Sequence, residues 1–283
     1  MSSWVSLLSI LAVVPQALAS CAYGTHLHER AEVIQAPTFG YSAANGPANW
    51  FNLNPEANDL CATGNNQSPI NLASGSFSLT SSSSLNIQIP DFAQGATFEN
   101  LGSTVEVVAD GLGGKMQIGN VAYNLSQFHF HLPSEHLDDG TSMAMEMHMV
   151  WRGADNSLAV IGIYIDIDDG SAVPRVQSSA SAVVNRVLEV VDKIPNLGDH
   201  VTTKALKMTD IVALINSGSL QSYSGSLTTP PCSEGVKWYV STKKVSVPVK
   251  TYIKARNVIG YNARFPQNVP GQENILTLFA EAT

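Results

Sequence analysis

Short apolar runs separated by polar, glycine-rich or serine-rich stretches make up the chain between residues 39 and 170. Runs of β-branched, aliphatic and aromatic residues occur at 85–89, 104–108 and 158–167. Runs of this length, bounded by turn residues, predict β-strands. The serine-rich stretch 74–84 predicts a surface loop or an edge strand, because strand-like sequence resumes directly after it. The pattern therefore favours a mainly β protein.

Two later segments change to the spacing of an amphipathic helix. Between residues 175 and 194 the apolar positions fall on one face. These positions are Val176, Val183, Val184, Val187, Leu188 and Val191. The spacing predicts a helix there and a shorter one over 209–215. Strand-like runs return at 238–241 and 245–249, and no internal repeat or boundary divides the chain, so a single domain is expected.

The segment 127–131, Gln-Phe-His-Phe-His, carries two histidines on a strand-like sequence. Side chains alternate between the two faces of a strand. Gln127, His129 and His131 are therefore expected on one face, with Phe128 and Phe130 on the other. Two imidazoles on one face of a strand form two thirds of a metal site.

A second strand candidate, 142–151, contains a third histidine. It alternates Met143, Met145, Met147 and Met149 on one face with Ala144, Glu146, His148 and Val150 on the other. If it pairs antiparallel with 127–131 through a turn near 138–140, His148 meets His129 and His131. Three histidines and an open position are the pattern of a catalytic zinc site.

Gln127 and Glu146 share the face of the histidines. Each would there accept an imidazole N–H and fix the tautomer that binds metal. A structural or surface group of histidines is the alternative that spacing alone leaves open. The four methionines are expected as apolar core on the far face rather than as copper ligands.

The first twenty residues carry no charge, contain an apolar run at 5–14 and end in Ala17-Leu18-Ala19 before Ser20. This predicts a secretory signal over residues 1–19, a flexible lead-in over 20–38 and one domain over 39–283. The formal net charge of −8 then belongs to the mature, exported protein. An acidic chain without a Lys or Arg cluster argues against nucleic acid or anionic membrane as partner, and no stretch suits a membrane span. A small diffusible substrate fits better.

The three cysteines, Cys21, Cys61 and Cys232, lie far apart and lack Cys-x-x-Cys spacing. In an exported protein they predict a disulfide with one thiol left over, rather than a cysteine metal site. Asn66 and Asn124 each begin an N-glycosylation tripeptide. A proline directly after the first tripeptide makes Asn124 the better candidate.

Several further motifs are spread along the chain. Together with 127–131 they are Phe39-Gly40-Tyr41, Gln67-Ser68-Pro69-Ile70-Asn71, Ser134-Glu135-His136, Glu146-Met147-His148, Gly225-Ser226-Leu227-Thr228-Thr229-Pro230-Pro231-Cys232-Ser233-Glu234-Gly235 and Trp238. With them the chain resembles the alpha-class carbonic anhydrases from about residue 39 to the C-terminus. The resemblance implies a central, strongly twisted, mostly antiparallel sheet of about ten strands with small surface helices. It also implies Zn²⁺ on His129, His131 and His148, and reversible hydration of carbon dioxide to bicarbonate and a proton by zinc-bound hydroxide.

The same resemblance assigns roles to single residues. Thr228 would accept a hydrogen bond from the hydroxide and donate its own to Glu135, which orients the nucleophile. Without the resemblance, Thr228 would be an ordinary residue before a turn and Glu135 a surface acid or helix cap. Asn262 and Arg264 loosely match a segment whose backbone carbonyl receives the second N–H of His131.

Other residues match the substrate cavity of this family. They are Val150, Val160, Leu227 and Trp238 for the apolar carbon dioxide pocket, and Thr229 and Tyr41 for its polar side. Strand alternation alone places Val150 on the face of His148. The remaining positions rest on the resemblance.

The resemblance also implies a disulfide between Cys61 and Cys232, as in exported members. Cys21 is then left over: whether it links two chains into a homodimer, is lipid-modified as in a bacterial lipoprotein or stays free is open. Many members carry a proton-shuttling histidine in a Gly-His-Thr sequence, where this chain has Gly102-Ser103-Thr104. Serine cannot shuttle protons near neutral pH. Water chains, buffer or Glu106 would have to do so, and we expect a rate limited by proton transfer and sensitive to buffer.

Two other functions remain to be weighed. Some members of the family are inactive modules for adhesion or ligand binding, and these usually lack a metal ligand. All three histidines are present here with Gln127, Glu135, Glu146 and Thr228, which favours an enzyme. Ester hydrolysis at the same zinc site is expected only as a side activity.

Overall fold

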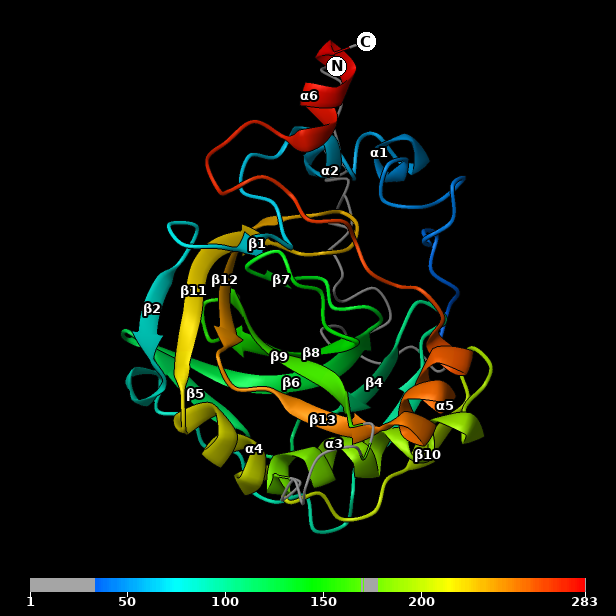
Figure 1. Ribbon diagram of the computed structural model, residues 1–283, viewed down its shortest axis with the longest axis vertical. Helices are drawn as coiled ribbons and strands as arrows, with labels where there is room; N and C mark the ends of the chain where they lie inside the picture. Colours follow the sequence, from blue (N-terminus) through cyan, green and yellow to red (C-terminus); the bar gives the residue numbers. More distant parts are fainter. Residues whose placement is uncertain (1–33, 169, 171–177, 283) are drawn as a thin grey trace, which may run out of the picture.

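A large, strongly twisted sheet, with eleven strands among the described residues, forms the centre of the molecule (Figure 1). The computed structural model describes residues 34–168, 170 and 178–282. Its strands are β1 (Asn71–Leu72), β2 (Ser78–Ser81), β3 (Thr97–Asn100), β4 (Val105–Val108), β5 (Lys115–Ile118), β6 (Val121–His131), β7 (Leu137–Asp138), β8 (Met145–Gly153), β9 (Leu158–Asp168), β10 (His200–Thr202), β11 (Ser219–Ser226), β12 (Glu234–Ser241) and β13 (Val245–Pro248). In the large sheet the order is β10-β3-β4-β6-β8-β9-β12-β11-β2, with β5 beside β6 and β13 beside β9.

The pairing within this sheet is mostly antiparallel, as the family resemblance implies. Among the described residues, β9 pairs in parallel with β12 and β13, and the other pairs of the large sheet are antiparallel. β9 therefore lies in the interior of the sheet. Both of its faces are also covered, because Ile161 and Ile163 pack in one apolar cluster and Val160 and Tyr164 in another. This explains its nearly continuous apolar sequence from residue 158 to 165, since a strand covered on both faces has no polar face to expose. A separate parallel pair, β1 with β7, lies apart from it.

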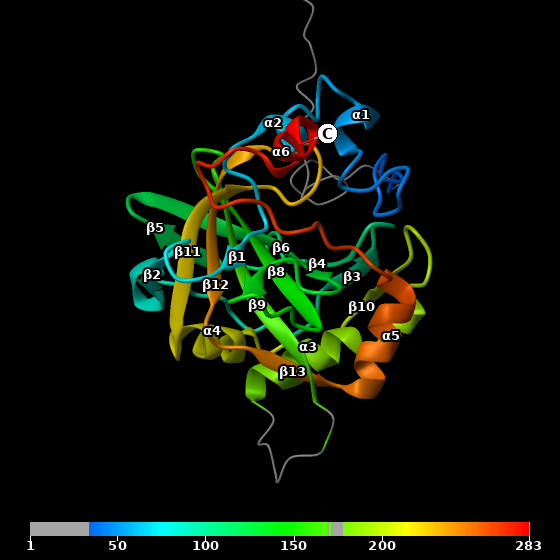
Figure 2. The same cartoon turned by 45° about the horizontal axis from the view of Figure 1, so that its top comes forward.

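Small helices surround the sheet. They are α1 (Trp50–Leu53), α2 (Leu60–Thr63), α3 (Ser179–Leu188), α4 (Met208–Asn216), α5 (Val249–Ile259) and α6 (Ile275–Glu281). Figure 1 shows α3, α4 and α5 together at one end and α1, α2 and α6 at the other, and Figure 2 keeps this separation. The expected signal over 1–19 and the lead-in up to residue 33 lie outside the described residues. No helix in the described part of the chain combines the length and the apolar character that a membrane crossing needs.

The two faces of the sheet pack against different partners. On one face, Phe128 and Phe130 join the main core together with residues of α3 and α4. Met145, Met147 and Met149 belong to this core, as predicted. Met143 does not: it precedes β8 and packs in the apolar cluster of the opposite face, because alternation applies only inside a strand.

Two predicted elements differ from the structure, and one helix was not predicted. The run 85–89 is no strand, because Asn86 adopts a left-handed conformation with φ of 44° and interrupts the extended backbone. The predicted helix 175–194 is divided into α3 and a 3₁₀ turn at Val191–Lys193, and residues 175–177 lie outside the described part. Helix α5 was not predicted, because it buries only Thr251 and Ala255 and so carries little apolar periodicity.

Candidate metal centre and active site

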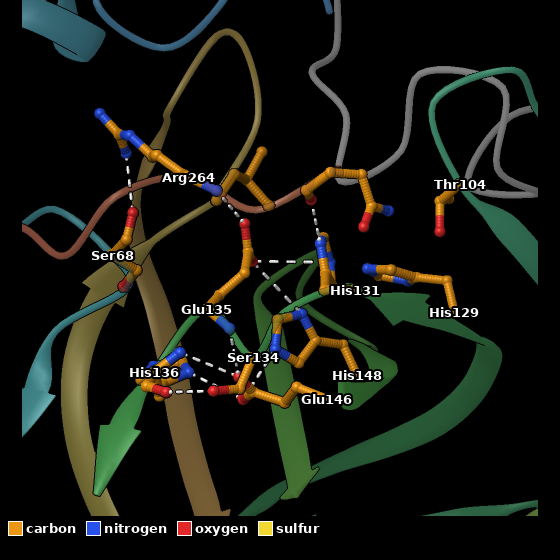
Figure 3. A network of polar contacts seen from close by, with 12 residues as sticks. Ser68, Thr104, His129, His131, Ser134, Glu135, His136, Glu146, His148 and Arg264 are labelled. Carbon is orange, nitrogen blue, oxygen red and sulfur yellow. Dashed lines mark hydrogen bonds and ion pairs between the residues drawn. The ribbon is translucent and has the colours of Figure 1, made fainter. Parts of the chain in front are cut away.

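Three imidazoles converge where β6 and β8 pair. His129 lies directly opposite His148 in the register, and His131 lies opposite Glu146. The ring centroids are 5.0 Å apart for His129 and His131, 5.4 Å for His129 and His148, and 4.5 Å for His131 and His148. One nitrogen of each ring lies within 4.8 Å of the other two (Figure 3). The alternation inferred from sequence thus brings these three side chains together.

In each imidazole, the nitrogen that does not face the other two rings contacts an oxygen atom of the protein. The contacts are His129 Nδ1 to Gln127 Oε1 at 2.9 Å, His131 Nδ1 to the carbonyl oxygen of Asn262 at 2.8 Å, and His148 Nε2 to Glu146 Oε1 at 2.9 Å. The amide oxygen and the backbone carbonyl accept hydrogen bonds, so Nδ1 of His129 and Nδ1 of His131 carry the proton. The carboxylate oxygen 2.9 Å from His148 Nε2 favours the proton on that nitrogen. The remaining nitrogens, Nε2 of His129 and His131 and Nδ1 of His148, then carry lone pairs.

The lone-pair nitrogens fit a metal ion. Nε2 of His131 and Nδ1 of His148 are buried and have no hydrogen-bond partner. A buried polar atom without a partner is costly unless a ligand satisfies it. Three neutral imidazole nitrogens facing one point are the donor set of catalytic Zn²⁺ sites, with a position left for a reactant.

Burial keeps the imidazoles of His129 and His131 in their neutral form. Desolvation, with the charges of His131 and His148 adding to it, holds the pKa of His129 well below its ordinary value. Burial also lowers the pKa of His131, against an opposite effect of the Glu135 carboxylate. Neutral imidazole is the form that binds metal.

The carboxylate of Glu146 contacts several polar groups next to these rings. Its Oε1 contacts both His148 Nε2 at 2.9 Å and His136 Nδ1 at 2.8 Å, and its Oε2 accepts the backbone N–H groups of Glu135 and His136, each at 2.9 Å. Burial acts to raise the pKa of Glu146, but the charges and hydrogen bonds of His136 and His148 outweigh it and hold that pKa well below its usual range. Glu146 is therefore a carboxylate.

Glycine at position 162 makes room for this carboxylate. Gly162 on β9 lies directly opposite His148. A Cβ placed there would come within 2.8 Å of Glu146 Oε1 and 3.3 Å of Val240. Glycine is therefore required at this position of the strand, because any side chain would clash with Glu146.

Glu135 reaches the metal centre from the connection between β6 and β7. Its Oε2 lies 3.5 Å from His131 Nε2 and 3.8 Å from His148 Nδ1, and its Oε1 accepts the backbone N–H of Arg264 at 2.8 Å (Figure 3). This carboxylate is thus fixed at one oxygen and directed at the imidazoles by the other. Thr228, whose predicted partner is Glu135, is fully buried in the connection between β11 and β12.

A disulfide joins Cys61 of α2 to Cys232, which confirms the predicted pair. Cys232 lies in the same connection as Thr228 and Thr229. Gln67 supports this connection by donating its side-chain N–H to the carbonyl of Cys232 at 3.0 Å. The bridge therefore ties the N-terminal end of the fold to the segment that carries the predicted catalytic threonine.

An apolar wall lies beside the histidines. Val150, Val160, Leu227 and Trp238 are all buried in one cluster. Val150 and Val160 are directly opposite each other in the register, and the ring centroid of Trp238 is 4.8 Å from that of His148. The residues matched to the carbon dioxide pocket are therefore brought together, while Tyr41 packs in a different cluster, with Phe39 and Trp50.

A pocket of about 370 Å³ opens near Ser103. Phe39, Tyr41, Tyr261 and Asn262 also line it. Asn262 connects this pocket to the histidine site. Its side-chain N–H donates to the carbonyl of Ser103 at 3.1 Å, and its own backbone carbonyl accepts from His131. Glu106 lies opposite His129 in the register and is fully buried.

With this geometry described, comparison with known proteins identifies the family. Residues 45–274 match the model of the eukaryotic-type carbonic anhydrases. The chain belongs to the alpha carbonic anhydrases. It is 34% identical over 207 residues to a carbonic anhydrase of Pectobacterium carotovorum, covering 71% of this chain and 75% of that one.

The solved structures with this fold include carbonic anhydrases and dioscorin. The fungal alpha carbonic anhydrase of Aspergillus oryzae superposes with a TM-score of 0.78 at 36% identity, covering 87% of this chain and 99% of that one. Dioscorin complexed with ascorbate has a TM-score of 0.66 at 25% identity, covering 83% and 96%. The site residues of this carbonic anhydrase therefore carry more of the functional argument than its fold does.

Several residues of the site were not assigned a role from the sequence. His136 belongs to a quoted motif but lies in a loop, where alternation gives no direction. Tyr223, Ser68 and the side chain of Arg264 are distant in sequence from the histidines, and only the folded chain brings them close. The motif containing Ser68 and the loose match at Arg264 were the available signals.

The two candidate glycosylation sites differ in their surroundings. Asn124 is exposed on β6. The side-chain nitrogen of Asn66 donates to Glu234 at 3.1 Å, and its backbone N–H donates to the same carboxylate at 2.7 Å. The structure therefore favours Asn124 as the accessible one.

Proposed function

We propose that this alpha carbonic anhydrase hydrates carbon dioxide reversibly to bicarbonate and a proton, with Zn²⁺ held by His129, His131 and His148. One observation carries the proposal: three buried imidazoles are each fixed by one nitrogen and direct the other to a common point. Zn²⁺ bound there would act as a Lewis acid that makes water nucleophilic at neutral pH. The residues of the chain would orient the nucleophile and bind the substrate.

The residues around the imidazoles fix their tautomers. Gln127, Glu146 and the carbonyl of Asn262 hold the protonated nitrogens away from the metal. Thr228 would donate its hydroxyl proton to Glu135 and accept a hydrogen bond from the attacking oxygen, which directs a lone pair at the substrate. The fixed carboxylate of Glu135 supports this role.

The apolar wall suits an apolar substrate. Carbon dioxide has no hydrogen to donate and accepts only weakly, so Val150, Val160, Leu227 and Trp238 would hold it by excluding water. Thr229, almost fully buried beside Thr228, would offer a polar contact to bicarbonate. Because Ser103 replaces a histidine at the matched position, the proton would leave through buffer, water or Glu106.

We also propose that the protein is exported after removal of residues 1–19 and is glycosylated at Asn124. The disulfide supports an oxidising compartment, and the exposure of Asn124 supports its modification. A homodimer, for example through Cys21, which lies outside the described residues, stays a prediction. Mass spectrometry of the protein from the culture medium, before and after enzymatic deglycosylation, tests the cleavage site and Asn124 together.

The test of the central proposal is metal analysis with a carbon dioxide hydration assay. We expect about one zinc per chain in the wild type. His148→Ala should lose zinc and hydration, and chelation of the wild type should do the same. His200→Ala is the matched control, because His200 is an exposed histidine of the same sheet. Retention of zinc and activity in His148→Ala would overturn the proposal, and folded, zinc-loaded wild type without hydration would favour a binding module.

A further inference from the structure

Helix α6 is attached to the fold by its N-terminal cap and by one face. The side chain of Asn274 donates to the carbonyl of Gly64 at 2.9 Å and accepts the backbone N–H of Leu276 at 2.9 Å. Thr277 Oγ1 donates to the carbonyl of Ala62 in α2 at 3.1 Å. Thr277 therefore faces α2, at the end of the molecule where Figures 1 and 2 show α1, α2 and α6 together. None of the residues of α6 is buried.

The apolar residues of α6 lie on the side of the helix that faces away from α2. Ile275, Leu278, Phe279 and Ala282 follow the spacing i, i+3, i+4 and i+7. At 3.6 residues per turn this spacing forms one stripe, centred about 150° around the helix axis from Thr277. Leu278 is 41% exposed and Phe279 is 61% exposed. A stripe with this spacing usually packs against a core, whereas this one points out of the fold.

A helix of seven residues has little stability of its own. Isolated helices shorter than about 12–15 residues are marginal in water, and most helical stability in proteins comes from packing of the apolar face. The contacts of Asn274 and Thr277 hold the polar face of α6. A partner that covers Leu278 and Phe279 would remove their apolar surface from water and stabilise the helix. The stripe therefore has the character of an interaction surface.

The charges around this stripe are all negative. The segments that contain α1, α2 and α6, residues 46–66 and 265–282, have no Lys, Arg or His. They contain four acidic residues, all of them exposed, which are Glu56, Asp59, Glu273 and Glu281. Leu60 of α2 is also exposed, directly after Asp59 in the chain. This end of the molecule thus combines exposed apolar side chains with carboxylates that no neighbouring cation in these segments offsets.

The negative charge determines which partner fits. A second copy bound through the same surface in a two-fold dimer would place four carboxylates opposite four carboxylates, because such an interface pairs a surface with itself. An anionic membrane would repel the surface for the same reason. A partner with apolar residues and Lys or Arg side chains would complement both the stripe and its charge.

We propose that α6 is a docking helix for a cationic amphipathic helix of another protein. The partner would cover Leu278 and Phe279 with its apolar face and place its cations near Glu273 and Glu281. Recognition through positions i, i+3, i+4 and i+7 is a recurrent way in which helices bind. The opposite charges would orient the partner and make association depend on salt. The proposal involves none of the residues of the metal centre and does not depend on it.

Binding of a synthetic helix to the whole chain tests the proposal. The probe is a fluorescent peptide of about 18 leucine and lysine residues with one apolar and one cationic face, long enough to form a helix. Its control has glutamate in place of every lysine. We expect fluorescence anisotropy to show binding of the cationic probe alone, and weaker binding as NaCl rises from about 50 mM to about 500 mM. Equal binding of the two peptides, or no binding of either, would contradict the proposal.

Two double variants locate the binding surface. Leu278→Ser with Phe279→Ser removes the stripe and should raise the Kd of the cationic probe about tenfold or more. Glu273→Lys with Glu281→Lys reverses the local charge and should favour the anionic peptide instead.

Leu79→Ser is the matched control, because Leu79 is a leucine 69% exposed on β2, in another part of the fold. It should leave the Kd unchanged. The denaturant midpoint and the hydration rate should stay at the wild-type values in all three variants. An unchanged Kd in the Leu278→Ser, Phe279→Ser variant would show that the probe binds elsewhere and would overturn the proposal.

Two further measurements test the other occupants. Light scattering after size exclusion should give the same oligomeric state for the wild type and for Leu278→Ser with Phe279→Ser. A dimer that this variant abolishes would assign the stripe to a second copy of the chain. Binding of the wild type to phosphatidylglycerol vesicles that the same variant abolishes would assign it to a membrane. Either result would overturn the proposal.

Discussion

Arg264 donates its backbone N–H to Glu135 Oε1 at 2.8 Å, while its buried guanidinium binds three oxygens of the segment 61–68. The guanidinium contacts are Gln67 Oε1 at 2.9 Å, Ser68 O at 2.8 Å and Cys61 O at 3.2 Å. One residue thus positions a carboxylate at the metal centre and holds the segment next to the disulfide. Displacement of its side chain is expected to move its backbone, and with it Glu135.

Arg264→Met should therefore lower both stability and activity. Removing the guanidinium leaves three buried oxygens without donors, and we expect a loss of about 3 kcal/mol or more in the free energy of unfolding. The folded fraction should also show a lower kcat, because Glu135 loses its fixed position. Denaturant titration and stopped-flow hydration measure the two effects.

Arg256→Met is the matched control. Both arginines face an aromatic ring, Arg264 at 5.6 Å from Trp50 and Arg256 at 5.8 Å from Tyr252. Arg256 is exposed, so its replacement should change stability by less than about 0.5 kcal/mol. Equal losses of stability in the two variants would show that stacking on the aromatic ring, and not the hydrogen bonds of Arg264, accounts for the effect.

Replacing Ser103 by histidine should relieve the limit on proton transfer. The wild-type rate of hydration is expected to rise with buffer concentration, since no histidine stands at this position near the metal centre. Ser103→His should raise the rate at low buffer by about tenfold and flatten its buffer dependence. Stopped-flow assays across a buffer series measure both. Ser83→His, on a distant exposed turn, should change neither; a wild-type rate independent of buffer would contradict the prediction.

The disulfide should contribute strongly to stability. It closes a loop of 171 residues, and a cross-link of this length restricts the unfolded chain. Cys61→Ala with Cys232→Ala should lower the free energy of unfolding by about 2–5 kcal/mol. Denaturant titration under non-reducing conditions measures the loss. Cys21→Ser should leave the midpoint unchanged, and a comparable loss in that variant would mean that another pairing is present.

Acid should destabilise the metal-free protein through His129 and His131. Burial keeps their folded-state pKa values below the ordinary value of 6.5. The unfolded chain therefore binds more protons below about pH 6.5, and stability falls as the pH drops further. The slope is at most about 1.4 kcal/mol per pH unit for each histidine.

Denaturant midpoints of the chelated protein between about pH 5 and pH 7.5 measure this slope. His129→Gln should flatten it, since one of the two titrating groups is gone. His200→Gln should leave it unchanged, because that side chain is exposed. An undiminished slope in His129→Gln would assign the acid sensitivity to other groups.

The sequence predicted the site best where local geometry decides it. Strand alternation placed His129 and His131 on one face of their strand. An antiparallel pairing of β6 with β8 was then enough to bring His148 to the same face. The zinc ligands could be proposed because two-residue periodicity is a property of the backbone itself. The disulfide and the apolar wall depended on family resemblance, since residues far apart in the chain form them.

The rest of the fold depended on contacts that no local pattern encodes. Asn86 interrupts a strand-like run, and α5 forms on small buried side chains. His136 sits in a loop and receives its direction from Glu146 and Tyr223. These positions are set by tertiary packing, which overrides local preference.

Gly162 shows how a residue without a side chain can restrict the sequences this site accepts. The carboxylate of Glu146 occupies the space that a side chain at position 162 would need. Even one methyl group there would displace Glu146 Oε1 from the imidazoles of His148 and His136. A library of variants should find position 162 as intolerant as the histidines. Shortening the neighbour, as in Gly162→Ala with Glu146→Asp, would be the route by which a methyl group becomes acceptable there.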